Sequence, residues 1–74
     1  MPKLKRLSGA EVRAILEAHG FIYLKTEGSH MKLRRTDEDG RIWTATVPTH
    51  RELATGTLSS IIHQSGLGRG PFEA

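Results

Sequence analysis

Three consecutive residues, Gly28, Ser29 and His30, combine the side-chain chemistry that cleavage of a phosphodiester needs. An imidazole exchanges a proton near neutral pH, a hydroxyl donates a hydrogen bond, and a glycine lets a backbone approach closely. Lys32 and Arg34 follow at alternate positions, so their charges could hold a phosphate and offset the negative charge that develops in the transition state. A surface histidine beside a solvated run of charge is the more ordinary interpretation, and the residues alone favour it.

Two further groups could take part in such chemistry. His50 follows the predicted third strand and would lie near His30 if the two strand ends are adjacent. The segment 55–57 (Thr-Gly-Thr) opens a predicted helix, where free N–H groups can bind a phosphate oxygen, although an ordinary helix cap needs the same groups. No motif with ligand spacing supports a metal site of both histidines and a carboxylate, so we expect no metal and no other cofactor. His19 and His63 are expected to be ordinary residues on helix surfaces.

Composition limits the classes of protein to consider. A chain of 74 residues has material for one core, so residues 1–74 are expected to form a single domain. Lys and Arg number 11 against 8 Asp and Glu, a net charge of +3 that suits a polyanion or an acidic protein as partner. The absence of cysteine excludes disulfides and fits a reducing, cytoplasmic location. No apolar run reaches the roughly 18 residues of a membrane span, and the basic N-terminus lacks the apolar segment of a secretory signal.

Two helices are predicted near the ends of the chain. Ser8 and Glu11 have the spacing of a capping box, so the first helix is expected from Gly9 to His19. Leu58, Ile61 and Ile62 recur at helical spacing in the second helix. Its expected N-cap is Thr55, and Gly66 is expected to end it.

Three short strands are predicted between the helices, at Phe21–Lys25, His30–Arg35 and Arg41–Val47. Alternation along the last two gives an apolar face of Met31, Leu33, Trp43, Ala45 and Val47, and a polar face of His30, Lys32, Arg34, Thr44 and Thr46. The sequence therefore predicts an α+β fold of order α-β-β-β-α, with one three-stranded antiparallel sheet and two helices on one face. This is the layout of the double-stranded RNA-binding domain. Residues 68–74 are expected to form a mobile tail in which Phe72 folds back.

Short motifs in a fixed order carry a resemblance to a known family. They are Leu7-Ser8-Gly9, Gly20-Phe21, Gly28-Ser29-His30, Val47-Pro48 with His50, and Gly56-Thr57-Leu58 with Ile61. The chain resembles HicA-type toxins, the small mRNA interferases of toxin–antitoxin pairs. The resemblance implies a double-stranded RNA-binding-like fold and metal-independent cleavage of mRNA that inhibits translation. It also implies that His30 is catalytic and that Gly28 and Ser29 belong to the site.

The same resemblance implies two partners, the mRNA substrate and a HicB-type antitoxin that would cover the active surface. Contact with DNA would come only indirectly, through the antitoxin complex.

The residues suggest a mechanism as a hypothesis. The RNA would be cut by attack of a ribose 2′-OH on its own 3′ phosphate, with His30 as general base or general acid. Lys32 and Arg34 would stabilise the negative charge on the phosphate oxygens. His50 is a candidate for the second proton transfer, because the predicted strand ends adjoin.

Two other functions remain open. A non-catalytic RNA-binding module would use the basic face of the sheet, with Lys25, Lys32 and Arg34 on phosphates, and its affinity would depend strongly on salt. A protein-interaction domain would present the same face to an acidic partner and would show no salt-sensitive binding of RNA.

Overall fold

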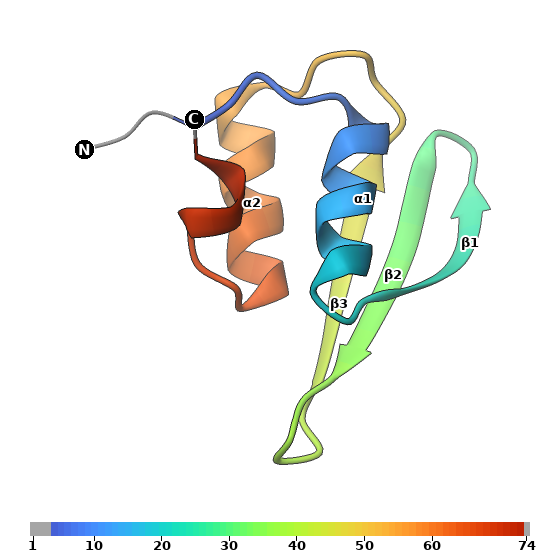
Figure 1. Ribbon diagram of the computed structural model, residues 1–74. Coiled ribbons are helices and arrows are strands. Elements are labelled where there is room, and N and C mark those ends of the chain that lie inside the picture. Colours follow the sequence, from blue (N-terminus) through green and yellow to red (C-terminus); the bar gives the residue numbers. More distant parts are fainter. Residues whose placement is uncertain (1–3, 74) are drawn as a thin grey trace.

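The computed structural model describes residues 4–73. Its elements are α1 (Gly9–Ala18), β1 (Ile22–Glu27), β2 (His30–Thr36), β3 (Ile42–Pro48), α2 (Thr55–Ser65) and a short 3-10 helix, η1 (Gly70–Phe72). The strands form one antiparallel sheet in the order β1-β2-β3, and α1 and α2 lie side by side over one of its faces (Figure 1). The α-β-β-β-α fold predicted from the sequence is confirmed. The second face of the sheet is left open.

Helix α1 begins at the predicted capping box. Ser8 Oγ accepts a hydrogen bond from the Glu11 backbone N–H at 3.1 Å, and the Ser8 N–H donates to the Glu11 carboxylate at 2.9 Å. The bonds from Ser8 lower the pKa of the Glu11 carboxyl, because they stabilise its ionised form. The helix ends at Ala18, one residue earlier than predicted, and Gly20 then turns the chain with a φ of +94°.

Helix α2 corrects one detail of the prediction. Its N-cap is Ala54, and no side chain bonds to the free N–H groups of the first turn. The expectation that Thr55 caps the helix is wrong, because Thr55 is already its first residue. The other end follows the prediction, since Gly66 stops the helix with a φ of +69°. A Cβ at Gly66 would lie 2.7–2.9 Å from the Trp43 ring, so glycine also lets that ring pack on the helix end.

The strands differ from the prediction mainly at their ends. β1 starts and ends later than expected, so the turn that follows has two residues instead of four. A register irregularity interrupts β1 between Tyr23 and Lys25. β3 includes Pro48, which the sequence analysis placed after the strand. Proline is tolerated here because β3 is an edge strand and the residue is its last.

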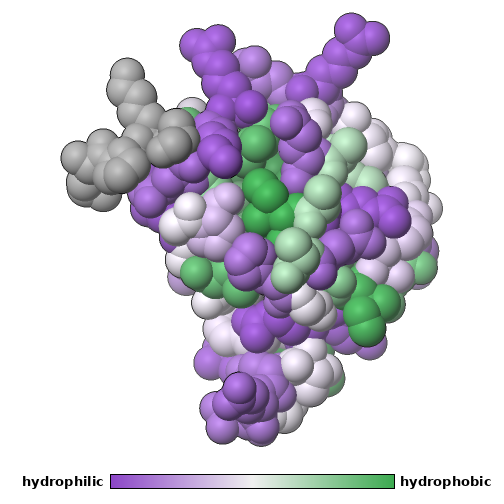
Figure 2. All heavy atoms as spheres, viewed as in Figure 1, coloured by the Kyte–Doolittle hydropathy of each residue, from purple (hydrophilic) through white to green (hydrophobic). Residues whose placement is uncertain are grey.

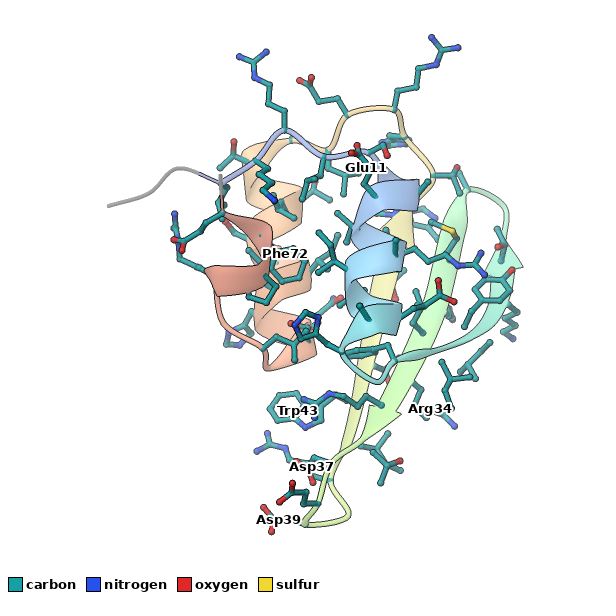
Figure 3. All side chains as sticks on the ribbon, in the orientation of Figure 1. Glu11, Arg34, Asp37, Asp39, Trp43 and Phe72 are labelled. Atoms are coloured by element: carbon teal, nitrogen blue, oxygen red, sulfur yellow. The ribbon has the colours of Figure 1, made fainter. Side chains whose placement is uncertain are left out.

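The predicted apolar face of the sheet forms the floor of the core. Four of its five residues are buried, and the fifth, Trp43, is half-buried. Figure 3 shows Trp43 on the side of the strands that the helices cover and Arg34 on the opposite side. On the helix side, hydrophilic residues dominate the surface, with an apolar strip between the two helices (Figure 2). The two-faced sheet inferred from the alternation is therefore confirmed.

The C-terminal segment lies beside α2 and adds Phe72 to the core (Figure 1). Phe72 is fully buried, and its carbonyl accepts a hydrogen bond from the Lys5 N–H at 2.8 Å. Leu4 and Glu73 form a bridge beside this bond. The folding back of Phe72 expected from the sequence is confirmed (Figure 3). The mobility expected for residues 68–74 stays a prediction.

Each helix is also fixed to the sheet by polar contacts. The Gln64 side chain of α2 accepts a hydrogen bond from the Thr46 backbone N–H of β3 at 3.1 Å. The Arg13 guanidinium of α1 lies 3.8 Å from the centre of the Tyr23 ring of β1, a cation–π contact. These contacts join α2 to β3 and α1 to β1 on the face of the sheet opposite to His30, Lys32 and Arg34.

Candidate active site

The residues Gly28, Ser29 and His30 lie at the β1–β2 turn. Glu27 and His30 pair across the turn, which leaves Gly28 and Ser29 as its two central residues. Gly28 has a φ of +59° at the first central position, as a type II′ hairpin turn requires. His30 is the first residue of β2, and its side chain is exposed. The turn therefore presents the imidazole at the end of the sheet.

The end of β3 lies beside this turn. Pro48 pairs with His30, and the Thr49 N–H donates to the Ser29 carbonyl at 2.8 Å. His50 comes two residues after Pro48, and its side chain is also exposed. The structure thus brings the chain at His50 to the same end of the sheet as His30, as the sequence analysis expected from adjacent strand ends.

Helix α1 fixes the position of this loop through a residue whose contact the sequence did not indicate. The Gly9 N–H donates to the His50 carbonyl at 2.8 Å. A Cβ at Gly9 would lie 1.9 Å from the Pro48 carbonyl oxygen, so only glycine allows the helix to come this close. The motif Leu7-Ser8-Gly9 contains this glycine, but the local sequence pattern indicates only that a helix begins there. Its contact with β3 depends on the tertiary fold.

A carboxylate that sequence reasoning missed lies among the cations of the site. Glu27 Oε1 is 3.1 Å from the Lys25 ammonium and 3.1 Å from the Lys32 ammonium. The hydrogen bonds from Lys25 and then Lys32 lower the pKa of the Glu27 carboxyl. Lys32 was expected to be available to a phosphate, but in the structure it forms an ion pair with Glu27, which also pairs with Lys25. All three side chains are exposed, so solvent screens these ion pairs.

Arg34 lies farther from the imidazole than Lys32 does. Residues on one face of a strand recur about every 7 Å, so Arg34 is about 14 Å along β2 from His30 and Lys32 is about half that distance. Arg34 pairs with Ile22 on β1 and with Thr44 on β3. Within residues 4–73 its side chain makes no ion pair with an acidic residue. Arg34 is thus an exposed cation on the open face, toward the end of β2 that lies opposite the β1–β2 turn.

Arg35, the next residue of β2, lies on the opposite face and has a structural role. Its guanidinium donates to the Ser65 carbonyl at the end of α2 at 3.1 Å. It also faces the rings of Phe21 and Trp43, with 5.5 and 5.6 Å to the ring centroids. This cation therefore supports the core and takes no part in the candidate site.

The other chemical candidates from the sequence do not assemble. In the described part of the chain, no three His, Asp or Glu side chains come together as metal ligands would. The start of α2 at residues 55–57 carries no contact that joins it to His30. None of the described helices is both long and apolar enough to cross a membrane. Of the candidates from the sequence, Ser29 lies in the β1–β2 turn, and His30 and Lys32 follow it on β2.

Comparison with known protein families gives a match to the chain. Residues 9–67 match the family described as the HicA toxin of bacterial toxin-antitoxin systems. The matched range begins at the buried glycine of α1, contains the whole sheet with His30, and ends just after α2. A search of curated proteins found no match to the chain. Since the match covers most of the sequence, the chain belongs to the HicA toxin family of bacterial toxin–antitoxin systems.

Proposed function

We propose that the chain is a metal-independent endoribonuclease that cleaves mRNA in the cytoplasm and thereby inhibits translation. Family membership supports the role of toxin, and the family implies an antitoxin as partner. The observation that carries the assignment of the site is the exposed His30 at the start of β2, held between Glu27 and Pro48 on the open, basic face. Exposed cations beside the histidine suit the phosphates of an RNA substrate.

His30 is proposed to transfer a proton during attack of the ribose 2′-OH on its own 3′ phosphate. As general base, it takes the proton of the 2′-OH while the new P–O2′ bond forms and the P–O5′ bond breaks. The products are a 2′,3′-cyclic phosphate and a 5′-OH, whose oxygen receives a proton from a general acid. His50 is the candidate for that acid, because its loop adjoins the turn that carries His30.

The cations are proposed to act on phosphates at different distances from the reaction. Lys32 lies two residues from His30 on the same face of β2, and it stabilises the negative charge on the reacting phosphate. Glu27 competes for Lys32, so binding of RNA replaces a carboxylate by a phosphate at this ammonium. Arg34 binds a phosphate further along the RNA. Gly28 and Ser29 supply a close backbone approach and a hydroxyl hydrogen bond.

The proposed partner that controls the activity is a HicB-type antitoxin that covers the active surface. Any contact with DNA would be made by the antitoxin in the complex, and this chain would take part only indirectly. A cationic open face is suited to an acidic cover, because opposite charges steer the two proteins together.

The experiment that tests the enzyme assignment is cleavage of RNA by the purified chain in EDTA. His30→Ala is compared with wild type, and His63→Ala is the matched control, because His63 is an exposed histidine on α2. We expect wild type and the control to cut and His30→Ala to lose the activity, with 5′-OH ends on the downstream fragments. A 5′-phosphate on those fragments would contradict attack by the 2′-OH.

Two other results would overturn parts of the proposal. If His30→Ala cuts as fast as wild type, the site lies elsewhere on the molecule. If no variant cuts but all bind RNA, the chain is a binding module that uses the same basic face, and its affinity would fall steeply with salt.

A further inference from the structure

The open face of the sheet carries large apolar side chains in addition to its cations. Ile22 is 68% exposed and Ile42 is 61% exposed. Ile22 pairs with Arg34, which pairs with Thr44, and Ile42 lies two residues before Thr44 on β3. Residues paired across a sheet share a face, and so do residues two apart on one strand. We call Ile22, Ile42 and Arg34 the isoleucine patch.

Contact with RNA does not account for this patch. Single-stranded RNA is held by cations on its phosphates and by aromatic rings on its bases, and isoleucine supplies neither. The aromatic side chains of the described chain lie on the core side or are buried in it; they are Phe21, Tyr23, Trp43 and Phe72. The patch is also centred about 14 Å from His30, at the opposite end of β2 from the turn.

We propose that the isoleucine patch is a docking surface for an acidic protein partner, and that this partner is the antitoxin. The inference rests on the proposed function, because it assigns a place to the partner that the function requires. A partner that offers apolar side chains flanking a carboxylate would bury Ile22 and Ile42 and pair with Arg34. Exposed apolar patches mark interaction surfaces, and arginine is enriched among the residues that carry the binding energy of interfaces.

Charge disfavours a second copy of the chain as the occupant. In a symmetric dimer through this patch, Arg34 of one copy would approach Arg34 of the other, and within residues 4–73 Arg34 has no acidic partner. Like charges brought together without acidic partners weaken association. The same positive charge attracts an acidic partner, so binding of such a partner is favoured over self-association.

The sheet therefore has two functional halves. The half at His30 holds the reaction, and the isoleucine patch holds the antitoxin. Because the halves share one continuous face, a protein seated on the patch covers Arg34 and blocks the path of an RNA strand along β2. Arg34 serves both the RNA and the antitoxin in this scheme, but Ile22 and Ile42 serve only the antitoxin, so substitution of the two isoleucines separates neutralisation from cleavage.

The test uses the purified chain and the HicB-type antitoxin that is proposed above as its partner. Ile22→Thr, Ile42→Thr and the double variant keep the branched side chain that strands favour and remove apolar surface. Ser60→Thr is the control, because Ser60 is an exposed residue of α2 on the helix side. Binding is measured by calorimetry, RNA cleavage is measured with and without antitoxin, and thermal melting checks the fold.

We expect the Kd for the antitoxin to rise about tenfold in each single variant and about a hundredfold in the double variant, with cleavage in the absence of antitoxin unchanged. Wild-type affinity in the double variant would overturn the proposal. Loss of cleavage without antitoxin would also overturn it, because the patch would then belong to the RNA site. Calorimetry measures antitoxin binding whether or not the chain cleaves RNA. If wild type does not cleave RNA but binds the antitoxin, and the double variant binds it weakly, only the proposed enzyme function is refuted. Self-association of wild type that the double variant loses would assign the patch to a second copy.

Discussion

Replacement of Gly9 by alanine tests how strictly helix α1 positions the end of β3. Alanine normally stabilises a helix relative to glycine by up to about 1 kcal/mol. At this position the new Cβ would lie 1.9 Å from the Pro48 carbonyl oxygen and 3.0 Å from the Pro48 carbonyl carbon. Cβ contacts below 3.0 Å are essentially absent from proteins, so the helix and the strand must separate by about 1.1 Å.

The cost can be worked out from the contacts that this separation affects. Forcing an extra methyl group into a packed site costs about 1–3 kcal/mol. The Gly9 N–H bond to the His50 carbonyl would lengthen, and a bond of this kind contributes about 0.5–1.5 kcal/mol. Against the small helix gain, the net loss in free energy of unfolding is about 1–3 kcal/mol. In a domain of this size that lowers the melting temperature by roughly 5–20 °C.

The assay is thermal and urea unfolding followed by circular dichroism, and Gly56→Ala is the matched control. Gly56 lies in the first turn of α2, and a Cβ there would meet nothing within 4 Å. We expect this variant to melt at or above the wild-type temperature. The reasoning is refuted if Gly9→Ala melts within about 2 °C of wild type, or if both variants shift in the same direction by similar amounts.

Three further predictions follow from contacts described above. Gly66→Ala should lower the free energy of unfolding by about 2 kcal/mol or more, seen in urea titration, because its Cβ would collide with the Trp43 ring and its φ is +69°. The pKa of the Asp37 carboxyl lies below its ordinary 3.8, chiefly because Trp43 Nε1 donates a hydrogen bond to it. The ionised carboxylate therefore stabilises the fold above that pH, and this stabilisation is lost as the pH falls through the lowered pKa. Asp37→Asn should remove this part of the acid sensitivity, and a pH profile of melting equal to that of wild type would argue against the prediction. Glu27→Gln should tighten binding of RNA severalfold and steepen its salt dependence, because Lys32 loses an acidic competitor; equal affinity at low salt would contradict this.

The sequence predicts well those features that depend on near neighbours in the chain. The capping box needs only Ser8 and Glu11 three residues apart, and both of its hydrogen bonds are present. The alternation of β2 and β3 places His30 on the open face, because side chains alternate in any extended strand. The fold order, the two faces and the position of the histidine could therefore be predicted from the sequence.

Features that depend on the packing of distant segments could not be predicted. Glu27 was expected in a turn, and its ion pair with Lys32 exists because β1 continues to the residue opposite His30. The N-cap of α2 was misplaced by one residue, because threonine is the better capping side chain but the helix begins after Ala54, which has no side-chain capping group. The close approach of Gly9 to β3 leaves no trace in the local pattern. The roles of His30, His50 and Arg34 in cleavage stay predictions.

The hydrogen bond between Gln64 and the Thr46 N–H has a consequence for the state of the chain at high concentration. The outer margin of an edge strand is a template for pairing with another molecule, which leads to aggregation. A strand that approached β3 would have to displace the Gln64 side-chain amide before it could pair with the Thr46 N–H. On the other margin, the irregularity at Tyr23–Lys25 breaks the even spacing that an added strand needs. A three-stranded sheet with both margins obstructed in this way resists growth into fibres, although one of its faces is uncovered.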